Sequence, residues 1–145
     1  MKPFTRIPPP GWEQFWLAVP YVEVGRVRET GLDCWGLMMG MWWDEFGWSA
    51  PDPFPAWKSE DFETPVEGFA AAARLTRAMQ SDFERVTAPV LGVCMELRLG
   101  GQPAHVGMCL GGGRFIHTQP GVGVSVERFD GFNWRNRIGG LYAPI

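Results

Sequence analysis

The sequence predicts an α+β fold in which a helix that carries a cysteine packs on an antiparallel β-sheet. Helical patterns fill the first half of the 145 residues, whereas short apolar segments divided by glycine and proline fill the second half. Connections this short suit antiparallel strands, because a parallel pair needs a long crossover. The length suits one domain with a hydrophobic core, so we expect residues 1–145 to form a single domain.

The first thirty residues are expected to lead into the central helix. Residues 1–11 contain three consecutive prolines and a glycine, which indicates an extended lead-in. Residues 12–19 place two tryptophans, a phenylalanine and a valine at helical spacing. This pattern predicts a short helix with a buried stripe, and Pro20 ends it. Residues 21–30 are polar and contain glycine, which favours an irregular approach to the cysteine.

The central helix is predicted over residues 32–46, and Gly47 is expected to end it as the C′ residue. The segment is apolar on nearly every side, which is typical of a helix buried against a sheet. Gly36 and Gly40 fall on one face of this helix, so another part of the backbone can approach it closely there.

Residues 49–85 are predicted to form a loop and a helix inserted between the central helix and the sheet. A capping box supports the helix, with Thr64 as N-cap, Pro65 at the first helical position and Glu67 at N3. An alanine-rich segment then continues the helix to about Gln80. We expect this insertion to be a lid or an interaction arm rather than part of a catalytic core.

The second half of the chain is predicted to form the sheet. The expected strands cover residues 90–98, the segments around His105 and His117, residues 122–129 and residues 138–142. Helices first and strands afterwards place the cysteine helix on one face of this sheet.

Cys34 has the setting of a nucleophile. Asp33 precedes it and can cap the first helical turn by accepting backbone N–H bonds. The helix dipole then favours the thiolate of Cys34. The alternative is a buried, inert thiol, since free cysteine is among the most buried residue types. Cys94 and Cys109 have no such cap, and we expect both to be buried in strands.

The only two histidines, His105 and His117, lie on a predicted hairpin. Side chains alternate across a strand, so the loop decides whether the two imidazoles share a face. A loop of residues 111–113 pairs Leu110 with Arg114 and sets Gly107 opposite His117, which brings the histidines together diagonally. A two-residue turn would separate them. We therefore predict an odd-numbered loop or an equivalent bulge.

These residues suit acyl transfer through a thioester. In this hypothesis His105 takes the thiol proton, Cys34 attacks an amide carbonyl, and His117 orients the imidazole of His105. The backbone N–H of Cys34 would donate to the oxyanion. A zinc site is the weaker alternative, because no two ligand residues show zinc-type spacing.

Composition and charge exclude several other classes. The net charge of −3 indicates no excess of basic residues that would bind nucleic acid. The first residues lack the apolar core of a signal peptide, and no window approaches eighteen apolar residues. We therefore expect synthesis in the cytoplasm and no membrane span. The odd number of cysteines argues against a disulfide framework, and we expect no cofactor and no metal.

Two segments of the chain resemble the NlpC/p60 family of cysteine peptidases, and most of all its phage and prophage tail-associated members. The pattern Asp-Cys-x-Gly-Leu at residues 33–37 is followed by a His-Val-Gly strand at residues 105–107 and by His117 twelve residues after the first histidine. The resemblance implies a papain-like fold with a catalytic triad of Cys34, His105 and His117. It also implies that Tyr21 and Asp33 contribute to the oxyanion pocket or to substrate binding.

The same resemblance implies a function, which we state as an expectation. A member of this type would be an endopeptidase that cuts peptidoglycan stem peptides at the bond between γ-linked D-Glu and the diamino acid. It would be carried to the cell wall in a virion tail, with tail proteins as further partners. Two alternatives stay open: a non-catalytic assembly module of a phage tail tip, and a related thiol amidase or acyltransferase.

Overall fold

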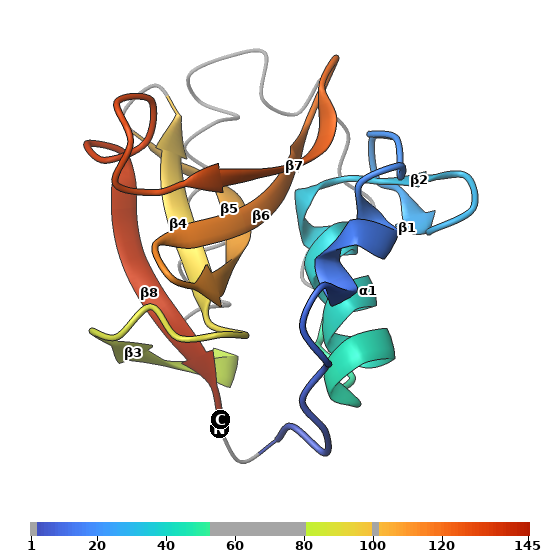
Figure 1. Ribbon diagram of the computed structural model, residues 1–145, viewed down its shortest axis with the longest axis horizontal. Coiled ribbons are helices and arrows are strands. Elements are labelled where there is room, and N and C mark those ends of the chain that lie inside the picture. The colour runs from blue at the N-terminus through green and yellow to red at the C-terminus, as the bar shows by residue number, and fades with distance from the viewer. Residues whose placement is uncertain (1–2, 53–80, 100–101) are drawn as a thin grey trace.

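The computed structural model describes residues 3–52, 81–99 and 102–145, which form a helical layer beside a six-stranded antiparallel sheet (Figure 1). The strand order is β3-β8-β4-β5-β6-β7, and every neighbouring pair is antiparallel. The predicted α+β fold is therefore confirmed. The elements are, in chain order, the 3₁₀ helix η1 (Trp12–Trp16), β1 (Arg26–Val27), β2 (Gly31–Leu32), α1 (Cys34–Phe46), β3 (Phe83–Val86), β4 (Cys94–Leu99), β5 (Gln102–Gly111), β6 (Arg114–Gln119), β7 (Gly123–Arg128) and β8 (Ile138–Pro144).

Both ends of α1 are fixed by the residues that the sequence indicated. Asp33 is the N-cap, and its carboxylate accepts a hydrogen bond from the backbone N–H of Gly36 at 2.7 Å. Gly47 ends the helix in the left-handed conformation, with φ of 70°, a conformation that glycine adopts without steric cost. The helix starts two residues later than predicted, because Leu32 pairs in the short β1–β2 hairpin.

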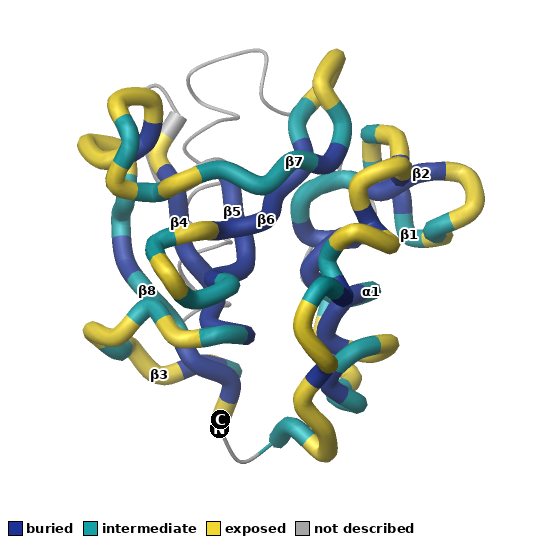
Figure 2. The backbone as a smooth tube through the Cα atoms, in the orientation of Figure 1, coloured by how far each residue is buried: buried dark blue, intermediate teal, exposed yellow. Residues whose placement is uncertain are grey.

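The sheet separates two hydrophobic clusters. The cluster between α1 and the sheet contains three fully buried tryptophans, at positions 16, 35 and 42, together with Met108 and Ile116 from β5 and β6. The cluster on the opposite face contains Phe115 and Trp134. Figure 2 shows the central strands β4, β5 and β6 as the buried part of the sheet. Many of the tryptophan side chains are therefore part of the hydrophobic core.

Gly36 lets two backbone segments meet at the start of α1. A side chain at this position would run into the carbonyl oxygen of Gly25, which lies just before β1. Gly40, one turn further on, faces the ring of Trp16 instead of a backbone. The expectation of a close backbone approach is therefore confirmed at Gly36 and wrong at Gly40.

Three other expectations differ from the structure. Residues 12–16 form a 3₁₀ helix, and Phe15 is 72% exposed rather than part of the buried stripe. The first predicted strand starts later, at Cys94, because Gly92 turns the chain with φ of 92°. Residues 83–86, expected to end the insertion, pair with β8 as the edge strand β3. The predicted capping box at Thr64, Pro65 and Glu67 lies outside the described residues.

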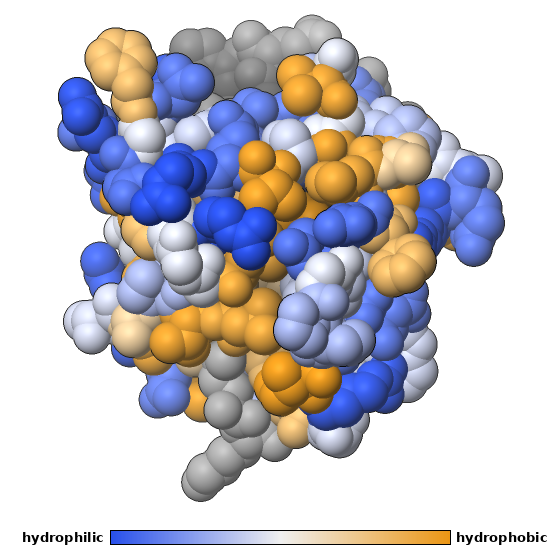
Figure 3. Space-filling view, in the orientation of Figure 1, coloured by the Kyte–Doolittle hydropathy of each residue, from blue (hydrophilic) through white to orange (hydrophobic). Residues whose placement is uncertain are grey.

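The surface carries exposed apolar side chains on both the helical layer and the sheet. Figure 3 shows hydrophobic residues along the seam between the two layers on the face in view. Phe15, Leu17 and Val122 are among the exposed large hydrophobic residues. Within the ranges that the structure describes, no helix has the length and apolar character needed to cross a membrane.

Candidate active site

Cys34 stands apart from the other two cysteines. It is the first residue of α1 and is partly exposed, whereas Cys94 and Cys109 are buried in β4 and β5. The burial of these two strand cysteines was predicted from the sequence. The sulfur of Cys34 accepts hydrogen bonds from the backbone N–H groups of Trp35 and Val106. One of these donors belongs to its own helix, and the other belongs to strand β5.

The contact with Val106 places the start of α1 next to His105, the predicted base. Val106 directly follows His105 on β5, so the sulfur lies against the backbone next to that histidine. The paired residues of β5 and β6 extend as far as Met108 opposite Ile116. The start of α1 therefore lies beside the part of β5 that precedes its paired segment with β6.

The two histidines meet as the alternation rule predicted. Nε2 of His105 and Nδ1 of His117 are 2.8 Å apart, and both side chains are buried. The hairpin achieves this with a bulge: Gly111, not Leu110, pairs with Arg114, while the register shifts between Cys109 and Gly111. The predicted pairing of Leu110 with Arg114 is therefore wrong in detail, and the predicted equivalent bulge is confirmed.

Glu127 on β7 extends this cluster, and sequence reasoning missed it. Its Oε2 lies 2.5 Å from Nε2 of His117, and the Ser125 hydroxyl lies 3.5 Å from the same nitrogen. His117 pairs with Ser125 in the β6–β7 register, so Glu127 lies diagonally from His117 on the same face. The alternation rule that was applied to the histidines would have found Glu127 if extended to the next strand.

Aromatic rings enclose the two imidazoles. The ring of Trp134 is stacked on that of His105 with 6.0 Å between centroids and meets His117 edge-on at 4.9 Å. Phe115 covers His117 from another side at 4.5 Å. Such packing fixes the orientation of both imidazoles and keeps water away from them. Nothing in the local sequence around Trp134 indicated this role.

Burial sets the charge state of the central pair. It lowers the pKa of His105 to about 3, and the neighbouring His117 acts in the same direction. Burial also raises the pKa of the Cys34 thiol to about 12, and the Asp33 carboxylate adds to this effect. The expected preference for the thiolate is therefore wrong, because burial and the charge of Asp33 outweigh the backbone hydrogen bonds to the sulfur and the charge of Arg26. At neutral pH the site holds a neutral thiol and a neutral imidazole.

Asp33 is engaged in holding the helix start. Its Oδ1 accepts from the Gly36 N–H and also from Nη1 of Arg26 at 2.5 Å. Nε of Arg26 in turn donates to Asp52 at 2.8 Å. Burial raises the pKa of Asp33, while the Gly36 N–H and Arg26 oppose the shift. These contacts link the β1–β2 hairpin to the residue before Cys34.

Tyr21 lies beside the same helix start. It forms an isolated parallel bridge with Leu32, two residues before Cys34. Burial raises the pKa of its hydroxyl, and the nearby Cys34 and Asp33 act in the same direction. Tyr21 is thus close enough to Cys34 for their charges to interact. Tyr21 therefore lies near both Cys34 and Asp33, and the binding roles that the resemblance implies for Tyr21 and Asp33 stay predictions.

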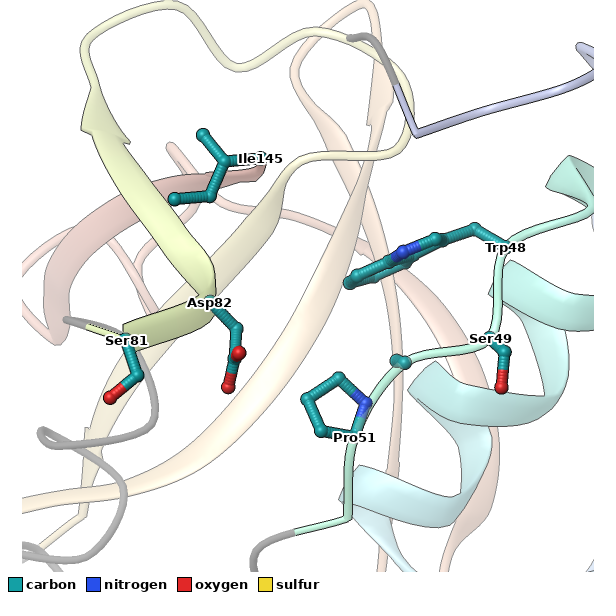
Figure 4. Close-up of a pocket in the computed structure, with 7 residues that line it drawn as sticks. Trp48, Ser49, Pro51, Ser81, Asp82 and Ile145 are labelled. Carbon is teal, nitrogen blue, oxygen red and sulfur yellow. The ribbon is translucent and has the colours of Figure 1, made fainter.

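A pocket of about 540 Å³ lies away from this cluster. It is lined by Trp48, Ser49, Ala50, Pro51, Ser81, Asp82 and Ile145 (Figure 4). These residues come from the segment after α1, from the start of the β3 region and from the C-terminal residue, and they include neither Cys34 nor either histidine. The pocket therefore gives no information about the chemistry at Cys34.

Comparison with known proteins identifies a family and similar solved structures. A family model described as "NlpC/P60 family" matches residues 18–141. The structure is similar to that of a lipoprotein-like NLP/P60 family protein from Staphylococcus aureus subsp. aureus Mu50, with a TM-score of 0.57 and 19% sequence identity. The match covers 92% of this chain and only 38% of that protein. No curated protein matches the chain.

Proposed function

Because the chain belongs to the NlpC/P60 family, whose members are generally cell-wall peptidases, we propose that it is a cysteine endopeptidase acting on peptidoglycan stem peptides. One observation carries the proposal. The Cys34 sulfur accepts from the N–H of the residue after His105, and His105 is itself hydrogen-bonded to His117 at 2.8 Å. A thiol, a base and an orienting group in this order are what nucleophilic acyl transfer needs.

The proposed reaction starts from the neutral pair. Nε2 of His105 is hydrogen-bonded to His117, which leaves Nδ1 of His105 for the thiol. This Nδ1 takes the thiol proton as the sulfur of Cys34 attacks the amide carbon. The resulting oxyanion accepts from the backbone N–H of Cys34, one of the helix-start N–H groups without an intrahelical partner. The protonated His105 then donates its proton to the leaving amine. Water hydrolyses the thioester, with His105 again as the base.

The bond that we propose is cut lies between γ-linked D-Glu and the diamino acid of the stem peptide. We assign Tyr21 to substrate binding beside the nucleophile, which its charge interaction with Cys34 supports. We assign Asp33 to holding the helix start in place through the Gly36 N–H and Arg26. The structural likeness to the staphylococcal protein supports the fold of this proposal and not its substrate.

We further propose a tail-associated setting, in which a phage or prophage tail carries the enzyme to the cell wall and tail proteins are its partners. The support for this part is the sequence pattern of residues 33–37 and 105–107. The exposed apolar side chains Phe15, Leu17 and Val122 would suit contacts with such partners.

Digestion of purified peptidoglycan, with fragments identified by mass, tests the proposal. Wild type should release fragments cut between D-Glu and the diamino acid, and Cys34→Ala and His105→Ala should release none. Cys109→Ala is the matched control, because it removes a buried thiol on β5 and should keep the activity. Products from a different amide would identify a related amidase or acyltransferase instead. Intact peptidoglycan after treatment with folded wild type would contradict the enzyme and favour the assembly module.

A further inference from the structure

Glu127 ends a continuous series of hydrogen bonds that starts at the base. His105 Nε2 bonds His117 Nδ1 at 2.8 Å, and His117 Nε2 bonds Glu127 Oε2 at 2.5 Å. The three side chains come from three adjacent strands, β5, β6 and β7. His117 is fully buried, while the side chain of Glu127 is 33% exposed. Glu127 thus joins the buried pair to water.

The chemistry of these groups fixes where the protons are. An ionised glutamate has no proton to donate, so His117 must carry its proton on Nε2. A neutral imidazole holds one ring proton, and therefore Nδ1 of His117 can only accept. His105 must then donate from Nε2. The lone pair of His105 consequently lies on Nδ1, the nitrogen that the proposed reaction uses.

We propose that Glu127 is a positioning residue that sets the tautomers of both histidines and so makes Nδ1 of His105 the proton acceptor. The inference deepens the proposed function, because it rests on His105 being the base. Without the carboxylate, His117 can move its proton to Nδ1 and donate toward His105. The proton of His105 would then occupy Nδ1, and the base would be blocked.

No other group around His117 among the described residues fixes the same choice. The groups that face it are His105 from β5, Ser125 from β7, and the rings of Phe115 and Trp134. The Ser125 hydroxyl can donate as well as accept, so it suits either tautomer. Burial lowers the pKa of His117, and the hydrogen bond and charge of Glu127 oppose that shift. Glu127 is therefore the one acceptor-only group in contact with the ring.

Nitrogen NMR of the two histidines tests the inference directly, because the chain has no others to crowd the spectrum. Uniformly ¹⁵N-labelled wild type should show the Nε2–H tautomer for both rings. Glu127→Ala should shift His117 away from this pure form and lower kcat about tenfold or more with little change in KM. Glu127→Gln keeps an acceptor oxygen, so it should restore the tautomer and most of kcat while the pKa of His117 falls below that of wild type.

Asp130→Asn is the matched control. It removes another carboxylate just beyond β7, one that pairs with exposed Arg128 and does not face the histidines, so both spectra and kcat should stay as in wild type. An Nδ1–H tautomer for His117 in wild type would overturn the inference. So would unchanged tautomers in Glu127→Ala or, where that variant does not fold, an unchanged pKa of His117 in Glu127→Gln. The NMR results do not depend on the substrate, so a failure to cut peptidoglycan would remove the proposed function alone.

Discussion

The two halves of the candidate site are built in different ways. The half that carries the thiol is local: Asp33, Cys34 and Gly36 lie within four consecutive residues, and one N-cap and one helix organise them. The half that carries the base draws His105, His117 and Glu127 from three strands, and only the strand register brings them together. A local motif can thus specify the predicted nucleophile, whereas the predicted base depends on the pairing of the whole sheet.

The surroundings of the two halves differ as well. The ion pairs of Arg26 with Asp33 and Asp52 are partly open to water, with side-chain exposures of 17–21%. The two histidines are buried under Trp134 and Phe115. Screening by solvent weakens exposed ion pairs, so the thiol half should respond little to loss of a charge. The base half should respond strongly to pH, because burial disfavours charged imidazoles.

The largest effect is expected where the halves act together. Cys34→Ala and His105→Ala should each lower kcat/KM for peptidoglycan by about a thousandfold or more, and the double variant should cost little beyond either single one. The reason is that a thiol without its base, or a base without its thiol, loses the same step. Steady-state kinetics on the four proteins checks this. Losses that multiply would show that the two residues act independently.

The second-largest effect is expected where Gly36 lies close to the backbone of Gly25, at the start of α1. Gly36→Ala should lower the free energy of unfolding by about 3 kcal/mol, because the new methyl group would overlap the Gly25 carbonyl oxygen. Gly40→Ala is the control, since its methyl group meets side chains alone, with the Trp16 ring at 3.1 Å, and the change gains about 1 kcal/mol of helix propensity. Urea denaturation should leave Gly40→Ala within about 1 kcal/mol of wild type. Equal losses in the two variants would contradict the close approach.

The base half should make stability depend on pH. The folded-state pKa of His105 is lowered to about 3 from its ordinary value of 6.5. Below pH 6.5 the unfolded chain therefore binds a proton that the folded chain excludes, and stability falls as pH falls. Between pH 6.5 and 5 the loss should be about 1 kcal/mol per pH unit, measured by urea denaturation. His105→Gln should flatten this slope, and an unchanged slope would contradict the buried neutral imidazole.

The smallest effect is expected at the cap of the thiol half. Asp33→Ala removes the bond to the Gly36 N–H and should cost about 1 kcal/mol, whereas Asp33→Asn keeps a capping oxygen and should cost only a few tenths. Thermal unfolding of the two variants gives this comparison. A loss in Asp33→Asn as large as in Asp33→Ala would mean that the ion pair with Arg26, and not the cap, holds the helix start.

The same contrast explains what could be predicted from the sequence. Asp33, Cys34 and Gly47 identified α1 and both of its ends, because caps and left-handed glycines act within a few residues. The meeting of His105 and His117 was also predictable, since side-chain alternation needs only the length of one hairpin. A bulge in this hairpin was among the predicted arrangements, but its position at Leu110 was not predicted.

Other features depend on contacts that no local pattern contains. Strand β3 pairs with β8 more than fifty residues later, so residues 83–86 gave no sign of belonging to the sheet. Trp134 reaches the histidines from the segment between β7 and β8, and Glu127 reaches them across a further strand. The charge state of Cys34 was predicted in the wrong direction, because burial depends on the packed environment and not on the helix start alone.

Alkylation of native protein by iodoacetamide at neutral pH tests most directly whether the two halves form one reactive site. Mass spectrometry of the digested protein identifies the labelled cysteine. We predict that Cys34 is labelled first, well ahead of the buried Cys94 and Cys109, and that His105→Ala slows its labelling at least about tenfold, because the neutral thiol loses the base that takes its proton. Labelling of Cys34 at the same rate in wild type and His105→Ala would contradict a shared reactive site.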